Sequence, residues 1–578
     1  MAYTYEPLPQ DCHTRILELY PALDPNAPLR GNFRFVDLNI NPFYDAISYT
    51  WGEPDFTTEI LIGDDLCVLC ITANLRDALV RYRFPTESRS IWADAICIDQ
   101  ANEEDKRKQI PSMRDIYRCA SSVLVWLGKD PLGEACLREI ALLSQRKTVP
   151  VMTSGRGKIT SILNRLVSLS WFSRRWVIQE IVLNPNVTFF CGAVSVPWLR
   201  AAQLLKYIPR DDSSPRISHL HTLKELWDVH NSLSLNKCDG QNTGILHLLS
   251  TFAETDCADA RDRIYALAGL ARDVVFDANE TIQRQNSIFI HIDYTSSVKQ
   301  VYYQFARAVG ETGGDDSRIR LLEEAGRRSN GSYSTEWLSW VPDWRISRLY
   351  PDVAVGSRGL SGIPLFGRGK VLMRSHITAK IESIISQTFP RNGPKSMQIL
   401  WINVVLTAIK KQIEDREGQL QLAEFKTGLL SRLLSFTLTG RSMFLRSHDY
   451  AEDLLEVMKS INYREVPENH YLFTISTVTK EGTTNGTLVG VGPRHMRVGD
   501  IVFLEQTELT MYGIATPIFR ETTESQRGKL DQSGEGQQGG AGHEYVKRRA
   551  CYLVGFAFIN GEIGEYHRTL TPMQIDVV

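Results

Sequence analysis

The first 200 residues of the chain offer carboxylates, tyrosines, arginines and tryptophans for chemistry, and almost no histidine. Of the twelve histidines in the sequence, only His13 lies in this region. Its motifs therefore cannot supply a Ser–His or Cys–His nucleophilic pair, or a zinc site that contains histidine. Cys67 and Cys70 form a lone pair on a strand pattern, with no second pair at metal-binding spacing. We interpret them as ordinary strand residues and predict no metal site.

The sequence also contains no complete phosphate-binding motif and no nucleophile motif. The stretch 154–158 (SGRGK) resembles a phosphate loop, but Met152 stands where such a loop has glycine and Ile159 where it has serine or threonine. No G-x-S-x-G elbow is present, and no G-x-G-x-x-G follows a strand pattern. Any chemistry in this region therefore depends on carboxylates and on the aromatic and basic residues near them.

A βαβ unit must position these residues. Ile91–Ile98 is a short apolar run that predicts a buried strand carrying one charge, Asp94. Asn102 and Asp105 predict the N-terminus of a helix, in which Pro111 occupies the first turn or produces a kink. Val123–Leu127 then predicts a second strand. This order predicts a parallel sheet with helices on its faces. The buried stripe of the helix would consist of Ile110, Met113, Ile116, Tyr117 and Ala120.

Flanking patterns extend this α/β region. Tyr44–Tyr49 predicts a strand that ends in a turn at 50–54, and Glu59–Ile62 with Leu66–Ile71 predicts a hairpin. Trp171–Leu183 predicts one helix with Ser173 as a possible N-cap. Parallel sheets bind ligands at the carboxyl ends of their strands. The turn Thr50–Glu53 and the loop Asp99–Glu104 are therefore the expected rim of a site.

Length and composition predict several domains in a cytoplasmic protein. We expect a lead-in segment at 1–40, the α/β domain at 41–195, a helical region at 196–350 and a strand-rich domain at 351–578. The last would contain a helical insertion near 400–460 and a mobile loop near 524–544. A net charge of −2 gives no reason to expect a nucleic-acid partner. No secretory signal or membrane span is visible, and the ten scattered cysteines suggest reduced thiols.

Three blocks resemble the signature of the fungal heterokaryon-incompatibility (HET) domain. They are Tyr44–Gly52 (YDAISYTWG), Ser90–Leu127 (from IWADAICIDQ to WLG) and Trp171–Glu180 (WFSRRWVIQE). The resemblance continues to Gly499-Asp500 and so covers most of the chain. It implies a long incompatibility protein that acts in non-self recognition, with growth arrest or cell death after incompatible cells fuse. It also implies an incompatible partner protein, allelic or non-allelic.

HET domains are in turn similar to TIR domains. Tyr44–Tyr49 resembles the opening TIR strand, and Trp176 and Glu180 have the spacing of a Trp–Glu pair on a later TIR helix. In enzymatically active TIR domains that glutamate cleaves the nicotinamide–ribose bond of NAD. The resemblance therefore implies a TIR-like parallel sheet. If the domain is catalytic, it implies Glu180 as the catalytic residue and NAD as the substrate, with no cofactor required.

The residues are compatible with that chemistry. A carboxylate can stabilise the oxocarbenium-like state through which an N-glycosidic bond breaks, without a metal or a histidine. On a helix, Trp176 would lie on the same face as Glu180, where it could raise the pKa of the carboxyl or simply pack. The predicted nucleotide site consists of Tyr49, Trp51, Asp94, Asp99, Arg175 and Trp176.

Each assignment has a structural alternative. Glu180 could be ion-paired with Arg174 or Arg175, and Arg175 could form a salt bridge with Glu180 or Asp94 instead of binding a phosphate. Asp94 could cap a turn, and Trp51 could be a packing residue. We expect three tryptophans to be core residues: Trp92, Trp126 and Trp171.

Two functions stay open. The first is an NAD glycohydrolase that depletes the cofactor through Glu180. The second is a non-catalytic signalling module in which the TIR-like core self-associates. The catalytic interpretation requires Glu180 to face an open cleft, whereas a carboxylate sealed under neighbouring side chains would leave the recognition role.

Overall fold

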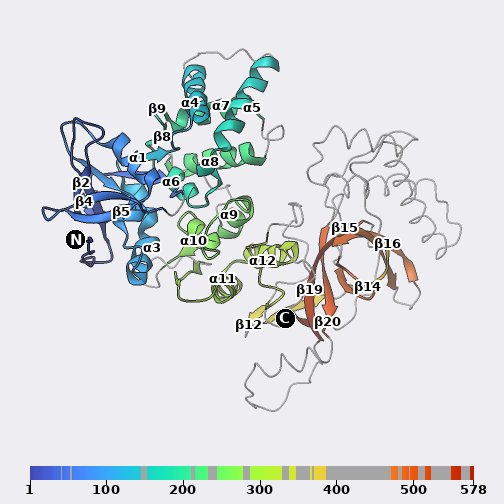
Figure 1. Cartoon of the computed structure of the whole chain (residues 1–578). Helices are drawn as coiled ribbons and strands as arrows, with labels where there is room; N and C mark the ends of the chain where they lie inside the picture. Colours follow the sequence, from blue (N-terminus) through green and yellow to red (C-terminus); the bar gives the residue numbers. More distant parts are fainter. Residues whose placement is uncertain are drawn as a thin grey trace. The chain divides into compact units, whose positions relative to one another are not determined.

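A computed structural model gives the fold as two compact units, Met1–Val298 and Lys299–Val578 (Figure 1). The structure describes the chain except for residues 41, 53–54, 145–152, 210–214, 232–243, 277–286, 329–336, 347–364, 368–369, 376, 386–469, 479–483, 494, 505–513, 523–548, 561–572 and 578. Within the described residues, no helix is long and apolar enough to cross a membrane. The domain boundaries predicted at 40, 195 and 350 remain predictions.

The N-terminal unit is built on a mixed sheet. Nine strands in its described part pair in the order β5 (Cys67–Ile71), β4 (Thr58–Ile62), β2 (Leu29–Asp37), β1 (His13–Leu19), β6 (Arg89–Trp92), β3 (Asp45–Tyr49), β7 (Ser122–Trp126), β8 (Val187–Cys191) and β9 (Val194–Pro197). The run β6–β3–β7–β8 is parallel, as the βαβ unit predicts. The pairs β1–β2, β1–β6, β4–β5 and β8–β9 are antiparallel. The α/β class is therefore confirmed, with a mixed sheet instead of an all-parallel one.

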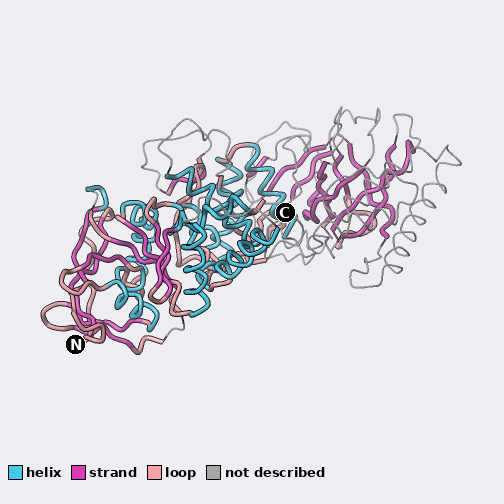
Figure 2. The backbone as a smooth tube through the Cα atoms, turned by 90° about the horizontal axis from the view of Figure 1, so that it is seen from above, coloured by secondary structure: helices cyan, strands magenta, loops and turns pink. Residues whose placement is uncertain are grey.

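Helices flank this sheet and continue beyond it (Figure 2). Helix α1 packs on β2 and β4, whereas α4 and α7 pack on β8 and β9. The helices of the unit are α1 (Ala73–Tyr82), α2 (Asp94–Cys97), α3 (Glu103–Cys119), α4 (Pro131–Ser144), α5 (Thr153–Val167), α6 (Val177–Val182), α7 (Trp198–Leu204), α8 (Pro215–Asn231), α9 (Ile245–Thr251) and α10 (Asp262–Ala268). Short 3-10 turns occur at Leu38–Ile40 (η1), Ser170–Ser173 (η2) and Leu205–Tyr207 (η3).

Local sequence signals correctly predict several of these elements. The Asn102 side chain accepts hydrogen bonds from the amides of Glu104 and Asp105, which begins α3 as the N-cap pattern predicts. Pro111 lies inside α3 and not in its first turn. The hairpin of β4 and β5 is also confirmed. The three expected core tryptophans, Trp92, Trp126 and Trp171, are each no more than 1% exposed.

Two predicted elements are wrong, and both lie beside Asp94 or Glu180. The strand predicted at 91–98 ends at Trp92, and the short helix α2 follows, with the Ala93 carbonyl accepting a hydrogen bond of 2.8 Å from the Cys97 amide. The single helix predicted at 171–183 is divided into η2 and α6. Arg174 between them is extended, since it forms a β-bridge with Asp256. Ser173 caps no helix, because its hydroxyl donates to the Ser170 carbonyl.

Residues 1–40 contribute two strands of the sheet, which the sequence patterns did not predict. Strand β1 lies between β2 and β6, and its residues Ile16 and Leu17 are fully buried. A buried ion pair joins this strand to α3, with 2.8 Å between Arg15 Nη1 and Asp105 Oδ2. The segment is therefore an integral part of the sheet that positions β3.

In its described residues, the C-terminal unit combines helices with a largely antiparallel sheet. It contains α11 (Val298–Thr312), α12 (Asp315–Arg328), β12 (Leu365–Gly367), β13 (Lys370–Ser375), β14 (Ile377–Ile385), β15 (His470–Val478), β16 (Thr484–Pro493), β17 (Ile501–Leu504), β18 (Ile514–Glu521), β19 (Arg549–Asn560) and β20 (Met573–Val577). Strands β14, β15, β16, β19, β18 and β17 pair in a ring, each antiparallel to the next. The predicted insertion near 400–460 and loop near 524–544 lie outside the described residues.

Candidate functional site

The candidate site lies where β3 and β6 end. Both strands run in the same direction, so their carboxyl ends meet at one edge of the sheet. Ser48 and Tyr49 close β3, and Asp94 follows β6 at the start of α2. The segment from η2 to α6 brings Trp171, Arg174 and Glu180 to the same place. These residues, together with Trp51, form what we call the polar cluster.

Glu180 is the most deeply buried acid of the polar cluster, with a relative exposure of 2%. Its carboxylate accepts a hydrogen bond from the Ser48 hydroxyl, which in turn accepts one from the Trp171 indole at 2.7 Å. Burial raises the pKa of Glu180 to about 7, while Arg174 and the Ser48 hydrogen bond act in the opposite direction. The carboxyl therefore titrates near neutral pH in a closed environment.

Asp94 occupies a more open position. Its carboxylate accepts a hydrogen bond of 2.8 Å from the Trp51 indole. Both side chains are half-buried. The protein atoms around Asp94 raise the pKa of its carboxyl, whereas Arg174 and Trp51 oppose that rise. The predicted residues Trp51 and Asp94 are therefore brought together at the more exposed part of the polar cluster.

Arg174 interacts with both acids. It donates a hydrogen bond to the Tyr49 carbonyl, and its charge lowers the pKa of Glu180 and of Asp94. Because one cation faces two carboxyls, the polar cluster can hold both acids ionised only at an electrostatic penalty. Protonation of one of them relieves that penalty.

Tyr49 also belongs to the polar cluster. Its side chain is 2% exposed, and its hydroxyl has no hydrogen-bond partner among the residues that the structure describes. Burial and the charge of Asp94 raise its pKa well above the ordinary value, so the hydroxyl stays protonated. Tyr49 thus carries a buried donor close to the Asp94 carboxylate.

The structure places the remaining predicted site residues in other interactions. The Asp99 carboxylate accepts a hydrogen bond from the Ala101 amide in its own turn. The Arg175 guanidinium, 1% exposed, donates to the carbonyls of Phe252 and Arg263. The Trp176 indole donates to Asp262 at 3.0 Å. These three residues are therefore not members of the polar cluster, and their roles in nucleotide binding remain predictions.

Three members of the polar cluster were not predicted as site residues: Ser48, Trp171 and Arg174. Ser48 is a buried hydroxyl within an apolar strand, and that is the signal that could have identified it. Trp171 was predicted as a core residue, and its indole N–H contributes to the site as well. Arg174 was considered only as a possible ion-pair partner of Glu180.

Metal chemistry has no visible support here. Across the part of the chain that the structure describes, no three His, Cys, Asp or Glu side chains are grouped so that they could hold a metal ion. The polar cluster contains two carboxylates with an arginine, a serine, a tyrosine and two indoles.

Residues 44–180 match the family described as Heterokaryon incompatibility protein (HET). This match begins at Tyr44, one residue before β3, and ends at Glu180, so it spans the whole polar cluster. Residues 44–180 form a HET domain. The three blocks noted in the sequence all fall within the match, which confirms the resemblance that they indicated.

A curated fungal relative extends the likeness beyond the HET domain. The chain is 27% identical over 411 residues to "Heterokaryon incompatibility protein 6, OR allele" from Neurospora crassa. The aligned region covers 58% of this chain and 59% of the relative. The chain thus spans about three-fifths of the length of that protein. No solved structure matches the chain.

Proposed function

We propose that this chain acts in fungal heterokaryon incompatibility, as an effector of non-self recognition that leads to growth arrest or cell death. The HET domain and the similarity to an incompatibility protein of Neurospora crassa support this role. The partner is an incompatible protein, allelic or non-allelic, met when cells of different type fuse.

At the biochemical level, we infer a recognition and signalling module whose polar cluster is closed in the resting state. The burial of Glu180 carries this inference. The carboxylate is 2% exposed and bonded to Ser48, so a nucleotide has no access to it in this conformation. The catalytic interpretation requires the opposite arrangement, an acid that faces an open cleft.

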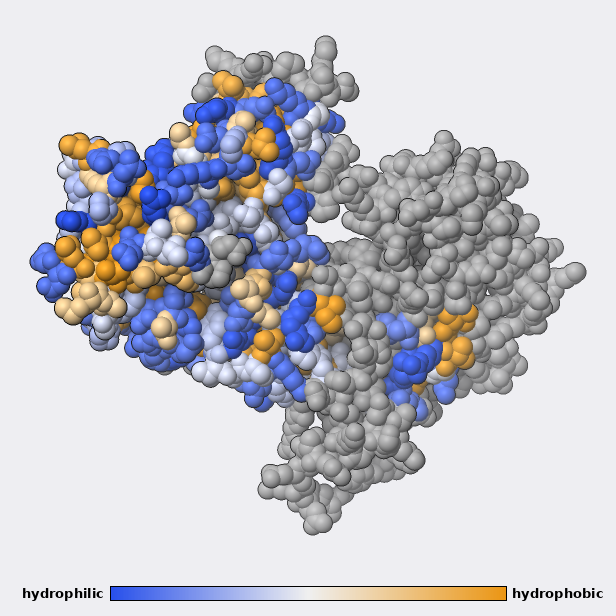
Figure 3. Space-filling view, viewed as in Figure 1, coloured by the Kyte–Doolittle hydropathy of each residue, from blue (hydrophilic) through white to orange (hydrophobic). Residues whose placement is uncertain are grey.

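Self-association is the form of signalling that we propose for this module. Figure 3 shows hydrophobic residues gathered on the N-terminal unit over the β2–β4–β5 end of the sheet. Leu66, in the turn between β4 and β5, is 41% exposed. Exposed apolar surface of this kind is typical of protein–protein contacts.

NAD cleavage at a TIR-like site is the second candidate. It is favoured by the pKa of Glu180, which is raised to about 7, and by the half-buried Trp51 and Asp94 beside it. In that case the structure is the inactive state, and Glu180 must become accessible before it can stabilise the ribosyl cation. Trp51 would then be the aromatic residue available to stack on a base.

One pair of measurements separates the two candidates. Purified protein is incubated with NAD and assayed for free nicotinamide, and the same variants are expressed in fungal cells to score toxicity. Glu180→Gln keeps the shape and the hydrogen-bond acceptor of the buried side chain, and Glu180→Ala removes both. The recognition role predicts no nicotinamide release and toxicity that Glu180→Gln retains. Nicotinamide release that Glu180→Gln abolishes would establish the enzyme instead.

A further inference from the structure

Helix α6, which carries Glu180, lies between two sets of partners. Glu180 and the preceding Arg174 interact with Ser48 and Tyr49 of β3. Other side chains of the same segment interact with residues 252–266, which lie beyond the HET match. We call residues 252–266 together with residues 293–296 the clamp. All of these residues belong to the N-terminal unit.

The clamp holds the start of α6 through its backbone. The Asp256 amide donates to the Ser173 carbonyl at 2.6 Å, and the Arg175 amide donates to the Asp256 carbonyl at 2.8 Å. These two bonds form the β-bridge that keeps Arg174 extended. The direction in which the chain enters α6 is therefore fixed by a residue outside the HET domain.

Three side chains continue the contact with the clamp. Arg175 donates to the Phe252 carbonyl at 2.8 Å, Gln179 donates to the Ala266 carbonyl at 2.8 Å, and Trp176 donates to Asp262 at 3.0 Å. Arg175 and Gln179 are each at most 2% exposed. Three residues that precede Glu180 in the sequence are thus bound to the clamp, while Glu180 is bound to β3.

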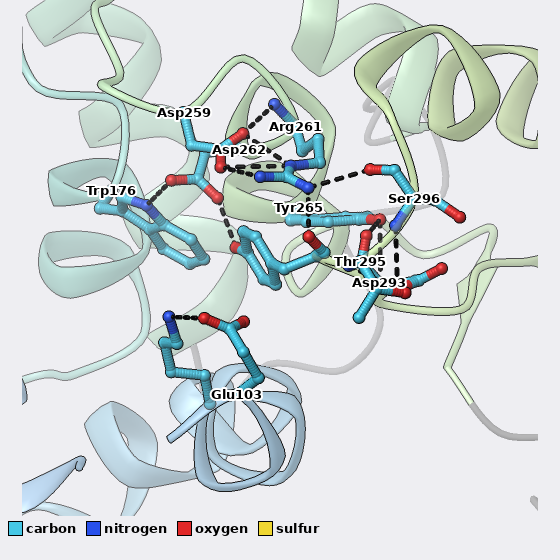
Figure 4. A network of polar contacts seen from close by, with 11 residues as sticks. Glu103, Trp176, Asp259, Arg261, Asp262, Tyr265, Asp293, Thr295 and Ser296 are labelled. Carbon is cyan, nitrogen blue, oxygen red and sulfur yellow. Dashed lines mark hydrogen bonds and ion pairs between the residues drawn. The ribbon is translucent and has the colours of Figure 1, made fainter. Parts of the chain in front are cut away.

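Asp262 joins the two parts of the clamp at the start of α6, because it binds both Trp176 and Tyr294 (Figure 4). One carboxylate oxygen accepts the Trp176 indole hydrogen, and the other accepts the Tyr294 hydroxyl hydrogen at 2.5 Å. Arg261 supports the same region, because it pairs with Asp259 and donates to the Ser296 carbonyl at 2.9 Å. Figure 4 shows Asp262 between the Trp176 indole and the 293–296 loop.

We propose that the clamp keeps the polar cluster closed, with Asp262 as the positioning residue that fixes Trp176 and so holds Glu180 against Ser48. Release of the clamp frees α6 and exposes Glu180. This inference rests on the proposed function, because it names the element that keeps the site closed. The test measures the opening of α6 and not an activity, so the inference and the proposed function can fail separately.

The test is amide hydrogen exchange of the full-length protein, read by mass spectrometry. Tyr294→Phe removes one hydrogen bond to Asp262 and leaves the ring in place. Because the half-buried Asp262 carboxylate loses one of its two side-chain donors, we expect the amides of 178–183 to exchange about tenfold faster, with β1 and β2 unchanged. Trp176→Phe removes the other donor and should give the same local result.

Tyr5→Phe is the matched control. Tyr5 lies outside the clamp, and its hydroxyl donates to the Ile96 carbonyl at 3.0 Å. Its loss should leave exchange at 178–183 within about twofold of the wild type. Unchanged exchange in both Tyr294→Phe and Trp176→Phe would overturn the proposal. Acceleration in those two variants that spreads equally over β1 and β2, or an equal effect of Tyr5→Phe at 178–183, would overturn it as well.

Discussion

The Ser48 hydroxyl donates a hydrogen bond to the Glu180 carboxylate, although the two residues are 132 positions apart in the sequence. Ser48 in turn accepts the indole hydrogen of Trp171. The only hydrogen of the serine hydroxyl is thus committed to the acid, and the indole prevents the hydroxyl from turning away. This chain of contacts closes the polar cluster, and the predictions below test its parts.

Glu180→Gln should change how stability depends on pH. The pKa of Glu180 in the folded protein is about 7, above its ordinary value of 4.5. Because the pKa of this carboxyl is higher in the folded protein, the unfolded chain loses the proton at a lower pH than the folded protein does. The free energy of unfolding therefore falls as the pH rises from 4.5 to 7, and it stays lower above pH 7. The difference amounts to about 3 kcal/mol. Glu180→Gln should therefore unfold at a higher temperature than the wild type at pH 8 and at a similar temperature at pH 4.5. Calorimetry measures this difference, with Glu104→Gln on the exposed face of α3 as control. An advantage of Glu180→Gln that is the same at both pH values would contradict the assignment.

Ser48→Ala should destabilise the N-terminal unit through its two hydrogen bonds. The substitution leaves the Trp171 indole and the Glu180 carboxylate without their shared partner, which costs about 1–3 kcal/mol for buried groups. A double-mutant cycle with Glu180→Ala, which removes the acceptor, should show a coupling of at least about 0.5 kcal/mol. Chemical unfolding of the single and double variants provides the values. Strict additivity would mean that Ser48 and Glu180 do not interact in solution.

Arg174→Gln should raise the pKa of Glu180 further. The Arg174 guanidinium lowers the pKa of Glu180 and of Asp94, so its loss removes an opposing charge from both acids. In the Arg174→Gln background, the stability advantage of Glu180→Gln should then keep growing to a higher pH before it becomes constant. Arg174→Lys, which keeps the charge, is the control. If the advantage becomes constant at the same pH with and without Arg174, the guanidinium does not act on Glu180.

Asp105→Asn should destabilise the sheet that supports the polar cluster. The pair Arg15–Asp105 is nearly inaccessible, at 2% and 6% exposure. Loss of one partner leaves a buried charge unpaired, which costs about 3 kcal/mol. Glu104→Gln breaks the exposed pair with Arg107 and should leave the unfolding midpoint nearly unchanged. Equal effects of the two substitutions would contradict a structural role for β1 at the centre of the sheet.

Local signals in the sequence predict the elements whose cause is local. The N-cap at Asn102, the β4–β5 hairpin and the parallel direction of β6 and β7 follow from residues close together in the chain. The sequence run 91–98 is apolar throughout except for Asp94, so periodicity alone cannot separate a strand from a strand followed by a short helix. In the structure Ala93 is the N-cap residue of α2, and its carbonyl accepts a hydrogen bond from the Cys97 amide.

The site depends on contacts between distant parts of the chain, which spacing cannot reveal. The helical spacing of Trp176 and Glu180 suggested that the indole lies beside the carboxylate. In the structure Trp176 is the N-cap residue of α6, and its indole binds Asp262, 86 positions away. Glu180 meets Trp171 instead, through Ser48. Glu180 could be predicted from the sequence, whereas the residues that enclose it could be identified only from the fold.

Carboxyl labelling of the wild-type protein tests the closed polar cluster most directly. Native full-length protein is treated with a carbodiimide and an amine, and the modified acids are identified by mass spectrometry. Glu103 and Glu104, each with 57% of the side chain exposed, serve as the accessible references. The account predicts that Glu180 stays unmodified while both references react. Modification of Glu180 to the same extent as the references would show an open site and would contradict the account.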